Sequence, residues 1–531
     1  MSTRLSKGGR LIDRSKSVEF TFDGKRLNGF EGDTLASALL ADNQRLVGRS
    51  FKYHRPRGIV ASGPEEPNAL VGLGAGSKFE PNQRATTTEL FAGLHSKSQN
   101  AWPSLEFDIG GINRIMSRVF PAGFYYKTFI FPRFAWKHIF EPFIRKAAGL
   151  GAAPTGKDAD KYEYFYAHVD VLIIGGGSSG LAAALEVGRS GAKVLVLEQK
   201  NTWGGRAPVD GVVIDNEKSE EWINKALAEL ESMPNVSLKN RTMGAGVYDH
   251  GWATGYESLT DHMPSKVGPR QRLWRIRATR ILTTTGAIER PLSFAGNDLP
   301  GVMLAGSVRD YIVDFGTSCG DIMVLATNND DAYRTAIAQC EVGLKVAIIL
   351  DARSNVTGEL PNKARSMGIR VETGMAISKV KGSKGVSGVS ICLQAGEGIP
   401  IEEIKCDVVA MSGGWSPIVH LWSHCGGKLN WDNDNAMFRP DADRPPLGAD
   451  GSGFVIVGGS ANGYLKADDS IKDAISQGKN VAKQVGFKPI KSKNITVSYY
   501  CFHYIASLEI EIQYSAVLVL IICIKLDTVP E

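Results

Sequence analysis

The fold is decided by the stretch from Asp170 to Ala184, which reads DVLIIGGGSSGLAAA. Its apolar start, Val171 to Ile174, predicts a buried parallel strand, and a helix is expected from about Ser179 to Ser190. Between the two lies the G-x-G-x-x-G pattern of a dinucleotide-binding βαβ unit. The stretch therefore predicts a Rossmann-like domain that binds its ligand at the turn from strand to helix.

The three glycines of the pattern have different physical roles. Gly175 suits a tight turn, Gly177 lets the backbone approach a pyrophosphate, and Gly180 lets the helix pack closely on the strand. The free N–H groups and the positive end of the helix dipole would face the phosphates. A βαβ unit without a ligand is the alternative interpretation of the same pattern.

A second apolar strand, Lys193 to Leu197, ends in Glu198, about twenty residues beyond the glycines. A carboxylate there can accept the hydrogen bonds of an adenosine ribose, and it disfavours a 2′-phosphate by its charge. The expected ligand is therefore NAD or FAD rather than NADP.

Glycines and polar residues at later turns extend the predicted site. Trp203 to Arg206 brings two glycines to a place where the backbone passes a diphosphate or a ring, and Arg241 to Asp249 would face the adenine. The full set of expected cofactor-binding residues is Gly175, Gly177, Ser179, Gly180, Glu198, Gln199, Lys200, Gly204, Gly205, Arg206, Gly244, Gly286, Gly459, Ser460 and Leu465.

Composition indicates a multidomain globular protein. The 531 residues are 43% hydrophobic and 22% charged, and the net charge of +5 is too small to argue for nucleic acid. Met1 to Ser17 has no apolar core of a signal peptide, so a cytoplasmic location is expected. The seven cysteines are scattered without a C-x-x-C pair, which predicts reduced thiols.

The first segment, residues 1–94, predicts a small β-rich domain with a strand at Val18 to Phe22 and a capped helix after Thr34. If it is ferredoxin-like, the thiolates of a C-x4-C-x2-C cluster loop would stand at Ala61, Glu66 and Ala69, and none of these is cysteine. We therefore expect no iron–sulfur cluster, and no other metal site is predicted.

Residues 95–168 are rich in aromatic side chains, and two interpretations are open. The segment could lie on a membrane surface, but it lacks an apolar run of about eighteen residues. We favour a connecting arm packed on a partner or a neighbouring domain, with no membrane contact. The basic run Lys52 to Gly58 is similarly interpreted as a solvated or interface loop.

A second βαβ pattern covers residues 301–404 but lacks the glycines. The strand that begins at Ile322 is followed by Thr327 to Asp331, where acidic side chains would block and repel a pyrophosphate. The chain is expected to return to the first domain at Cys406 to Gly414, so that this domain comprises residues 169–300 and 405–490. The fold class is α/β: a Rossmann-like FAD/NAD(P)-binding fold with an inserted second Rossmann-like domain, preceded by a ferredoxin-like domain.

This order resembles the flavoprotein disulfide reductases with two dinucleotide domains, although thiol reduction is not expected without a C-x-x-C pair. A closer resemblance covers residues 10 to 490. The run Lys52 to Gly58, the cysteine-free first domain, the arm Gly123 to Phe129 and the site from Gly175 to Glu198 together resemble the N-terminal half of the α subunit of heterotetrameric sarcosine oxidase.

The resemblance implies NAD in this chain, with FAD as the alternative. It also implies FAD and a covalent FMN on a β subunit or its interface with α, smaller γ and δ subunits, and sarcosine as substrate. Family members continue into a folate-binding domain, whereas residues 491–531 change character, and we interpret them as a truncation or a shifted reading frame. Folate would bind only if that domain were present.

Two functions from different classes remain open. The chain is either the α subunit of such an oxidase, or of a related amino-acid or opine oxidase or dehydrogenase, or it is a stand-alone FAD/NAD-dependent oxidoreductase. No catalytic residue can be assigned. His420 and His424 could share a helix face, and we interpret them as a structural pair.

Overall fold

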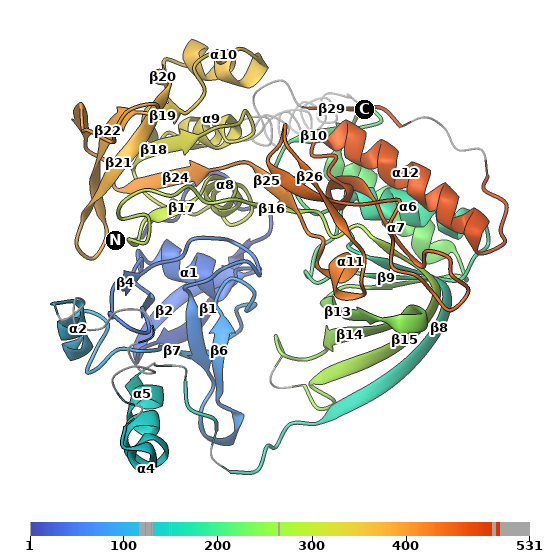
Figure 1. Cartoon of the computed structure of the whole chain (residues 1–531), viewed down its shortest axis with the longest axis horizontal. Helices are drawn as coiled ribbons and strands as arrows, with labels where there is room; N and C mark the ends of the chain where they lie inside the picture. The colour runs from blue at the N-terminus through green and yellow to red at the C-terminus, as the bar shows by residue number, and fades with distance from the viewer. Residues whose placement is uncertain are drawn as a thin grey trace, which may run out of the picture.

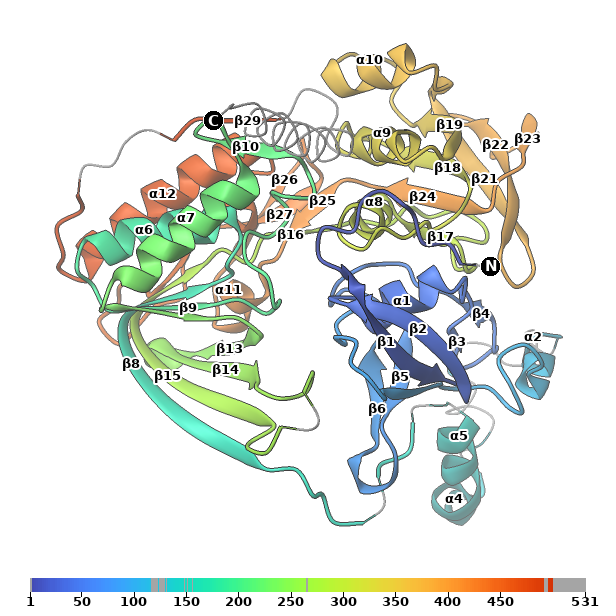
Figure 2. The same cartoon turned by 180° about the vertical axis from the view of Figure 1, so that it is seen from behind.

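The computed structural model describes residues 2–115, 123, 129, 131–147, 149, 151–154, 156–263, 266–490 and 495–499. They form an α/β protein built around three main sheets. Figures 1 and 2 show the N-terminal sheet next to a second five-stranded sheet, with a seven-stranded sheet and its helices to one side of both. The predicted fold class is confirmed.

The N-terminal sheet has the strand order β2-β1-β7-β5-β6, and one helix packs on it. A capping box starts this helix: the Thr34 side chain accepts from the Ser37 amide, and the Ser37 hydroxyl accepts from the Thr34 amide. Its elements are β1 (Asp13–Phe22), β2 (Lys25–Glu31), α1 (Leu35–Ala41), β3 (Gly48–Arg49), β4 (Pro56–Arg57), β5 (Leu70–Leu73), β6 (Glu80–Arg84) and β7 (His95–Ser98). Phe20 and Leu39 share one apolar core with Tyr311 of the second sheet's layer, so the two parts pack as one body.

The predicted basic loop lies at an internal interface. Arg57 forms an ion pair with Asp298, and a Cβ on Gly58 would lie 2.7 Å from the Cα of Pro300.

The aromatic arm that follows β7 contains α2 (Ile112–Ile115), α4 (Arg133–Ala135), a π-helical turn η4 (Trp136–Phe140) and α5 (Glu141–Ala147). Most of the run from Gly123 to Phe129 lies outside the described residues. Over the described ranges, no helix is both long and apolar enough to cross a membrane.

The seven-stranded sheet contains the predicted βαβ unit. Its order is β12-β9-β8-β15-β14-β13, with β28 also paired to β15, and the helices α6, α7 and α12 cover its upper half in Figure 1. The elements are β8 (Tyr162–Ile174), α6 (Ser178–Arg189), β9 (Val194–Leu197), α7 (Ser219–Ser232), β12 (Val236–Lys239), β13 (Thr242–Tyr248), β14 (Trp252–Ser258), β15 (Gln271–Thr283), β28 (Val455–Val457) and α12 (Ala467–Gln484). The predicted helix and the predicted strand Lys193 to Leu197 agree with α6 and β9 to within one residue, whereas β8 begins at Tyr162, nine residues before the predicted start at Val171.

The second five-stranded sheet has the order β17-β24-β18-β19-β20 and is parallel throughout. Its elements are β17 (Val302–Leu304), α8 (Ala305–Val313), β18 (Ile322–Thr327), α9 (Tyr333–Glu341), β19 (Lys345–Asp351), α10 (Glu359–Ser366), β20 (Val371–Thr373) and β24 (Val408–Ser412). A three-stranded antiparallel sheet flanks it, formed by β21 (Met375–Gly382), β22 (Val386–Leu393) and β23 (Glu402–Ile404).

One boundary prediction is wrong. The chain does not return to the first domain at Cys406 to Gly414, because β24 lies between β17 and β18 in the middle of the second sheet. All five residues of β24 are buried, and this makes it a central parallel strand there. The return occurs through β25 (Trp415–Pro417), which pairs with β16 (Ala287–Glu289). The remaining elements of the return are α11 (His420–His424), β26 (Leu429–Asp432) and β27 (Met437–Pro440).

The segment after residue 490 is partly integrated into the fold. β29 (Val497–Tyr499) adds a third strand to β10 (Val212–Ile214) and β11 (Glu217–Lys218), and the Asp215 amide donates to the Thr496 carbonyl oxygen at 2.8 Å. The prediction of an aberrant tail from residue 491 therefore does not hold for residues 495–499. The rest of that tail, from residue 500 onward, lies outside the described residues.

A candidate dinucleotide site

Two of the three predicted glycines are required by the protein's own packing. Gly175, at the end of β8, has a φ of 112°, and a Cβ there would lie 2.3 Å from the carbonyl oxygen of Thr284. A Cβ on Gly180, in the first turn of α6, would lie 1.9 Å from the carbonyl oxygen of Gly175. The tight turn and the close helix-to-strand contact are therefore both present, as the pattern predicts.

Gly177 is different, because none of the described residues fills the space beside it. Its backbone, with φ −66° and ψ 174°, suits any residue, and the nearest atom to an added Cβ is the Cα of Gly205 at 3.9 Å. Gly177 is the N-cap of α6, with no side-chain cap and no acidic residue in the first turn. The open side of the loop and the positive helix end together fit an anionic group such as a diphosphate.

The second predicted glycine pair lies directly against this loop. The Gly204 amide donates to the Gly176 carbonyl oxygen at 2.8 Å, and Gly177 and Gly204 form a parallel bridge. A Cβ on Gly205 would lie 3.1 Å from the Cα of Gly177. The structure thus brings Gly176 and Gly177 against Gly204 and Gly205, although α6 and β9 separate the two pairs in the sequence.

Glu198 holds the glycine loop through its carboxylate. One oxygen, Oε2, accepts from the Gly176 amide at 2.7 Å, and Oε1 accepts from the Lys200 amide at 2.8 Å. The side chain is buried, and burial raises the pKa of the carboxyl, while these amides counteract the shift. Glu198 is therefore next to the loop, as predicted for a ribose acceptor, whereas Gln199 and Lys200 are exposed.

Ser179, Gly459 and Ser460 meet at the start of α12. The Ser179 hydroxyl lies 2.8 Å from the Ser470 hydroxyl, which lies 3.1 Å from that of Ser460. The Gly459 amide donates to the Asp473 carboxylate at 2.8 Å. Three predicted residues from two distant parts of the chain therefore share one polar cluster beside the first turn of α6.

The three other predicted positions have different surroundings. A Cβ on Gly244 would meet the Ile174 side chain at 2.6 Å, so this glycine lets β13 pass close to the end of β8. Gly286 has a φ of 80° and its carbonyl oxygen accepts from the Ile418 amide at 3.0 Å. Leu465 is partly exposed, two residues before α12. Their contact with a ligand stays a prediction.

Arg206 forms ion pairs with two carboxylates of the protein itself. Its guanidinium lies 3.1 Å from an Asp210 carboxylate oxygen and 3.0 Å from one of Asp310 in α8, and it stacks over the Trp415 ring at 5.1 Å. Two carboxylates already neutralise this side chain, which joins the seven-stranded sheet to the second sheet. These contacts describe a structural residue, and no contact supports the predicted role in cofactor binding.

A buried carboxyl that the sequence did not reveal lies in the same interface. Glu289 of β16 accepts from the Gly306 amide at 2.7 Å, and burial raises the pKa of its carboxyl to about 7. Its other oxygen, Oε1, is buried without a hydrogen-bond partner among the described residues. Nothing in the local sequence marks this glutamate, because its environment comes from β16, β25 and α8 together.

The turn of the second Rossmann-like unit is closed by its own side chains. The Asn329 side chain donates to the Ser412 hydroxyl at 3.0 Å. Asp330 pairs with Arg353 at 2.7 Å, and Asp331 pairs with Arg309 at 3.0 Å. The predicted repulsion of a pyrophosphate is therefore wrong as an electrostatic argument, because arginines neutralise both carboxylates. That side chains exclude a pyrophosphate from this turn sterically stays a prediction.

Histidines and cysteines form no metal centre in the part of the chain that the structure describes, where no group of three potential ligands occurs. His420 and His424 begin and end the short helix α11, and the His424 ring contacts Tyr248 at 5.0 Å. His54 pairs with Asp108 at 2.7 Å.

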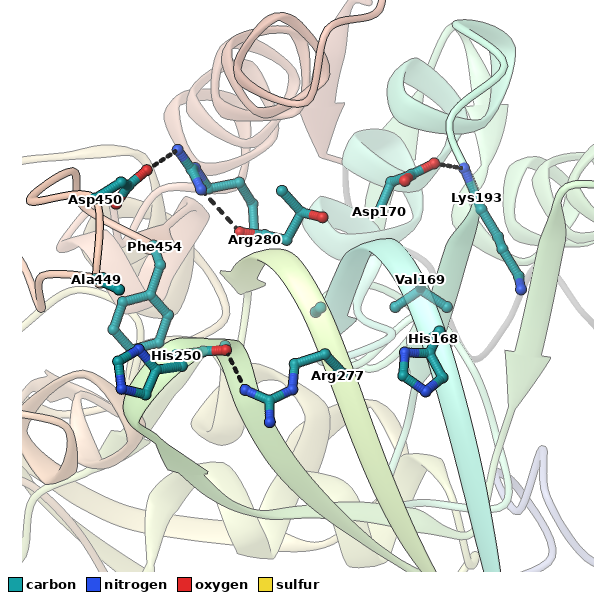
Figure 3. A pocket seen from close by; sticks show the side chains of 14 residues that line it. His168, Val169, Asp170, Lys193, His250, Arg277, Arg280, Ala449, Asp450 and Phe454 are labelled. Carbon is teal, nitrogen blue, oxygen red and sulfur yellow. Dashed lines mark hydrogen bonds and ion pairs between the residues drawn. The ribbon is translucent and has the colours of Figure 1, made fainter.

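An open pocket of about 520 Å³ lies away from the glycine loop (Figure 3). It is lined by His168, Lys193, His250, Arg277 and Arg280, among others. Asp170, also in its wall, precedes Gly175 by five strand residues, or roughly 17 Å. The candidate dinucleotide site is defined by backbone geometry beyond the C-terminal end of β8, and we assign the pocket no part in it.

Comparison with known proteins agrees with this geometry. A family model described as FAD dependent oxidoreductase matches residues 170–247. Sarcosine oxidase subunit alpha of Rhizobium meliloti (strain 1021) is 45% identical over 464 residues, which cover 87% of this chain and 45% of the relative. The chain is a relative of the sarcosine oxidase alpha subunits. The same subunit of Corynebacterium sp. (strain U-96) is 32% identical over 91% of this chain and 45% of its own length.

The chain spans less than half the length of these curated relatives. Among solved structures, the L-proline dehydrogenase of P. horikoshii superposes with a TM-score of 0.59 at 19% identity, over 91% of this chain and 77% of that one. This likeness supports the fold alone.

The cofactor prediction needs a correction at the N-terminal domain. A family model described as 2Fe-2S iron-sulfur cluster binding domain matches residues 15–101, and this match contradicts the prediction that the chain has no iron–sulfur cluster. Residues 15–101 contain no cysteine, so the thiolate ligands of such a cluster are not among them.

The loop from Val60 to Ala69 is organised by a carboxylate. Glu66 is 1% exposed, and its Oε2 accepts from the amides of Val60 and Ala61 at 2.8 and 2.7 Å. Its Oε1 accepts from the amides of Asn68 and Ala69 at 2.7 and 3.0 Å.

Proposed function

We propose that this chain is the dinucleotide-binding α subunit of an oxidase that demethylates sarcosine. The overall reaction consumes sarcosine, O2 and water and yields glycine, formaldehyde and hydrogen peroxide. Where tetrahydrofolate takes up the one-carbon unit, it replaces water as the co-substrate, and methylenetetrahydrofolate is formed in place of formaldehyde. The observation that supports the proposal best is a glycine loop left open at Gly177, in a chain 45% identical to a sarcosine oxidase alpha subunit.

The residues of the loop would hold a dinucleotide as follows. The backbone at Gly177 and the N-terminal turn of α6 would face the diphosphate, and Glu198 would accept from a ribose hydroxyl while keeping Gly176 in place. The second Rossmann-like unit would stay empty, because Asn329 and its neighbours fill the turn. Bound at one site only, the dinucleotide has no second nucleotide in this chain to exchange a hydride with.

Oxidation of sarcosine would then occur on a flavin of a β subunit that docks on this chain. This division of labour follows from the family resemblance, together with the absence of an assignable catalytic constellation in the described residues. The role of this chain would be to retain the dinucleotide and to position the partner.

Two measurements test the proposal. Denaturing the purified chain should release close to one equivalent of dinucleotide, and chromatography identifies it as NAD or FAD. Co-expression with the companion β, γ and δ subunits should give a complex that produces peroxide from sarcosine. A complex that forms but leaves sarcosine unoxidised would refute the assignment of substrate.

The second candidate is a stand-alone FAD-dependent oxidoreductase, which the family model at residues 170–247 favours. The absorption spectrum separates the two. A yellow chain that NADH bleaches without any partner supports the stand-alone enzyme, whereas a colourless chain that releases NAD supports the subunit.

A further inference from the structure

The lower half of the seven-stranded sheet carries an exposed face of unusual composition. Strands β8 and β15 pair over their whole length, and both extend well past α6, α7 and α12 in Figures 1 and 2. The registers of β8, β15, β14 and β13 place alternate residues of the four strands on one side. We call these residues the aromatic face: Tyr162, Tyr164, Tyr166, His168, Leu273, Arg275, Arg277, Trp252, Thr254, Tyr256, Met243 and Tyr248.

Large side chains on this face are exposed rather than packed. Tyr164 and Tyr166 are 61% and 62% exposed, and Met243 and Tyr248 are 44% and 45% exposed. The opposite side of the same strands is core, where residues such as Ile276 are fully buried. Tyrosine, tryptophan, methionine and arginine are the residue types enriched in the centres of protein–protein interfaces.

The arginines of β15 differ between the two sides of the sheet. On the packed side, Arg272 pairs with Glu163 and Glu257. On the aromatic face, the Arg275 guanidinium instead lies 5.1 and 5.4 Å from the ring centres of Tyr164 and Tyr166.

Arg277 behaves like Arg275. It stacks on Trp252 at 5.1 Å and donates to the His250 carbonyl oxygen at 2.7 Å. Within the described residues, neither arginine of the face forms an ion pair. Aromatic rings therefore hold both guanidinium groups in place, and the charged groups at the surface can form ion pairs with carboxylates of another chain.

The pocket of Figure 3 continues the face at its upper end. His168 and Arg277 belong to both, and Figure 3 draws them side by side on neighbouring strands. Lys193 adds a further cation to the wall. Of the two carboxylates there, Asp170 accepts from the Lys193 amide and Asp450 lies 3.8 Å from Arg280. The pocket could therefore receive an acidic side chain at the edge of the face.

We propose that the aromatic face is a docking surface for a companion subunit of the oxidase, one that presents carboxylate side chains opposite Arg275 and Arg277. The inference rests on the proposed function, and it assigns the partner to a particular surface. Four strands about 4.8 Å apart and seven residues of about 3.3 Å give a footprint of roughly 19 by 23 Å. A stable interface buries about 800 Å² on each partner, so this face would form its centre.

A second copy of this chain fits the face less well. A twofold interface places the same patch on both sides, which would bring the arginines of two copies together without a carboxylate from the face to separate them. Like charges at an interface core oppose association. The charge pattern therefore favours a different, acidic partner.

Hydroxyl-radical footprinting of the full chain, alone and in complex with the flavin-bearing companion subunit, tests the proposal without any mutation. Oxidation of Tyr164 and Tyr166 should fall severalfold in the complex. Oxidation of Trp431, a 52% exposed side chain on the β26–β27 hairpin, should stay unchanged.

Variants then measure the affinity. Arg275→Glu and the double variant Tyr164→Ala/Tyr166→Ala should each raise the Kd for the companion subunit about tenfold or more. The matched control is Arg370→Glu, an exposed arginine of the second sheet's layer that already pairs with Glu372 and Glu402. It should leave the Kd within about twofold, and melting curves of all variants verify that the fold is retained.

The outcomes separate this inference from the proposed function. A complex that forms while both tyrosines remain fully reactive, or whose Kd the face variants leave unchanged, overturns the docking surface and leaves the subunit assignment standing. A wild-type chain that binds no flavin-bearing companion overturns both. Protection that rises with the concentration of the chain alone, or only with anionic vesicles, would reveal self-association or a membrane in place of the acidic partner.

Discussion

Replacing Gly177 separates ligand binding from folding at the glycine loop. The backbone there is open to any residue, and an added Cβ would have its nearest neighbour at 3.9 Å. We therefore expect Gly177→Ala to change the free energy of unfolding by less than about 1 kcal/mol. The new methyl group nevertheless occupies the side from which a diphosphate would approach, so the variant should lose dinucleotide.

Gly177→Asp adds a charge to the steric effect. Like charges about 4 Å apart at an effective dielectric near 20 repel by roughly 4 kcal/mol. The helix dipole attracts the phosphates equally in the wild type and the variant, so the repulsion appears in full as a loss of roughly 4 kcal/mol, or about 1,000-fold in affinity. The assay is the amount of dinucleotide released on denaturation after extensive dialysis.

Gly180→Ala is the matched control, because its Cβ would overlap the Gly175 carbonyl oxygen at 1.9 Å. A backbone oxygen cannot give way as a flexible side chain does, so this variant should be destabilised by about 1 to 3 kcal/mol with or without ligand. One equivalent of dinucleotide retained by Gly177→Asp would refute the binding site. A Gly180→Ala protein that melts like the wild type would refute the packing of α6 on β8.

Three other predictions concern buried carboxylates. Glu198→Gln should weaken dinucleotide retention by about 1.5 to 3 kcal/mol, because a hydrogen bond to a charged acceptor is lost, and equilibrium dialysis against labelled dinucleotide measures it. The pKa of the Glu289 carboxyl is about 7 in the folded chain and near 4.5 in the unfolded chain. Between pH 4.5 and pH 7 the folded state therefore binds a proton that the unfolded state has released. The free energy of unfolding should fall by roughly 3 kcal/mol as the pH rises from about 4.5 to 7, and Glu289→Gln should remove that slope in denaturant titrations. Glu66→Ala leaves four backbone amides without their acceptor, and the two buried ones, of Ala61 and Ala69, cost about 1 to 3 kcal/mol each. Calorimetry should detect a lower melting temperature of the N-terminal sheet, and unchanged melting would count against the role assigned to Glu66.

The first βαβ unit could be predicted from the sequence alone. The reason is local geometry: Gly180 is required by the Gly175 carbonyl oxygen five residues earlier, and Gly175 by its own φ of 112°, so both requirements are visible in the sequence as glycines. The same holds for α1, whose capping box is formed by Thr34 and Ser37.

Only the tertiary structure decided which distant segments meet. An apolar run such as β24 indicates burial but not its neighbours, because parallel pairing depends on segments about a hundred residues apart. The residues around Arg206 in the sequence do not reveal whether it contacts a cofactor or two carboxylates. It pairs with a carboxylate of α8 because the fold places this helix next to it. The aromatic face likewise exists because β8 continues along β15 beyond the helices, which brings Tyr164 and Arg275 together from strands more than a hundred residues apart.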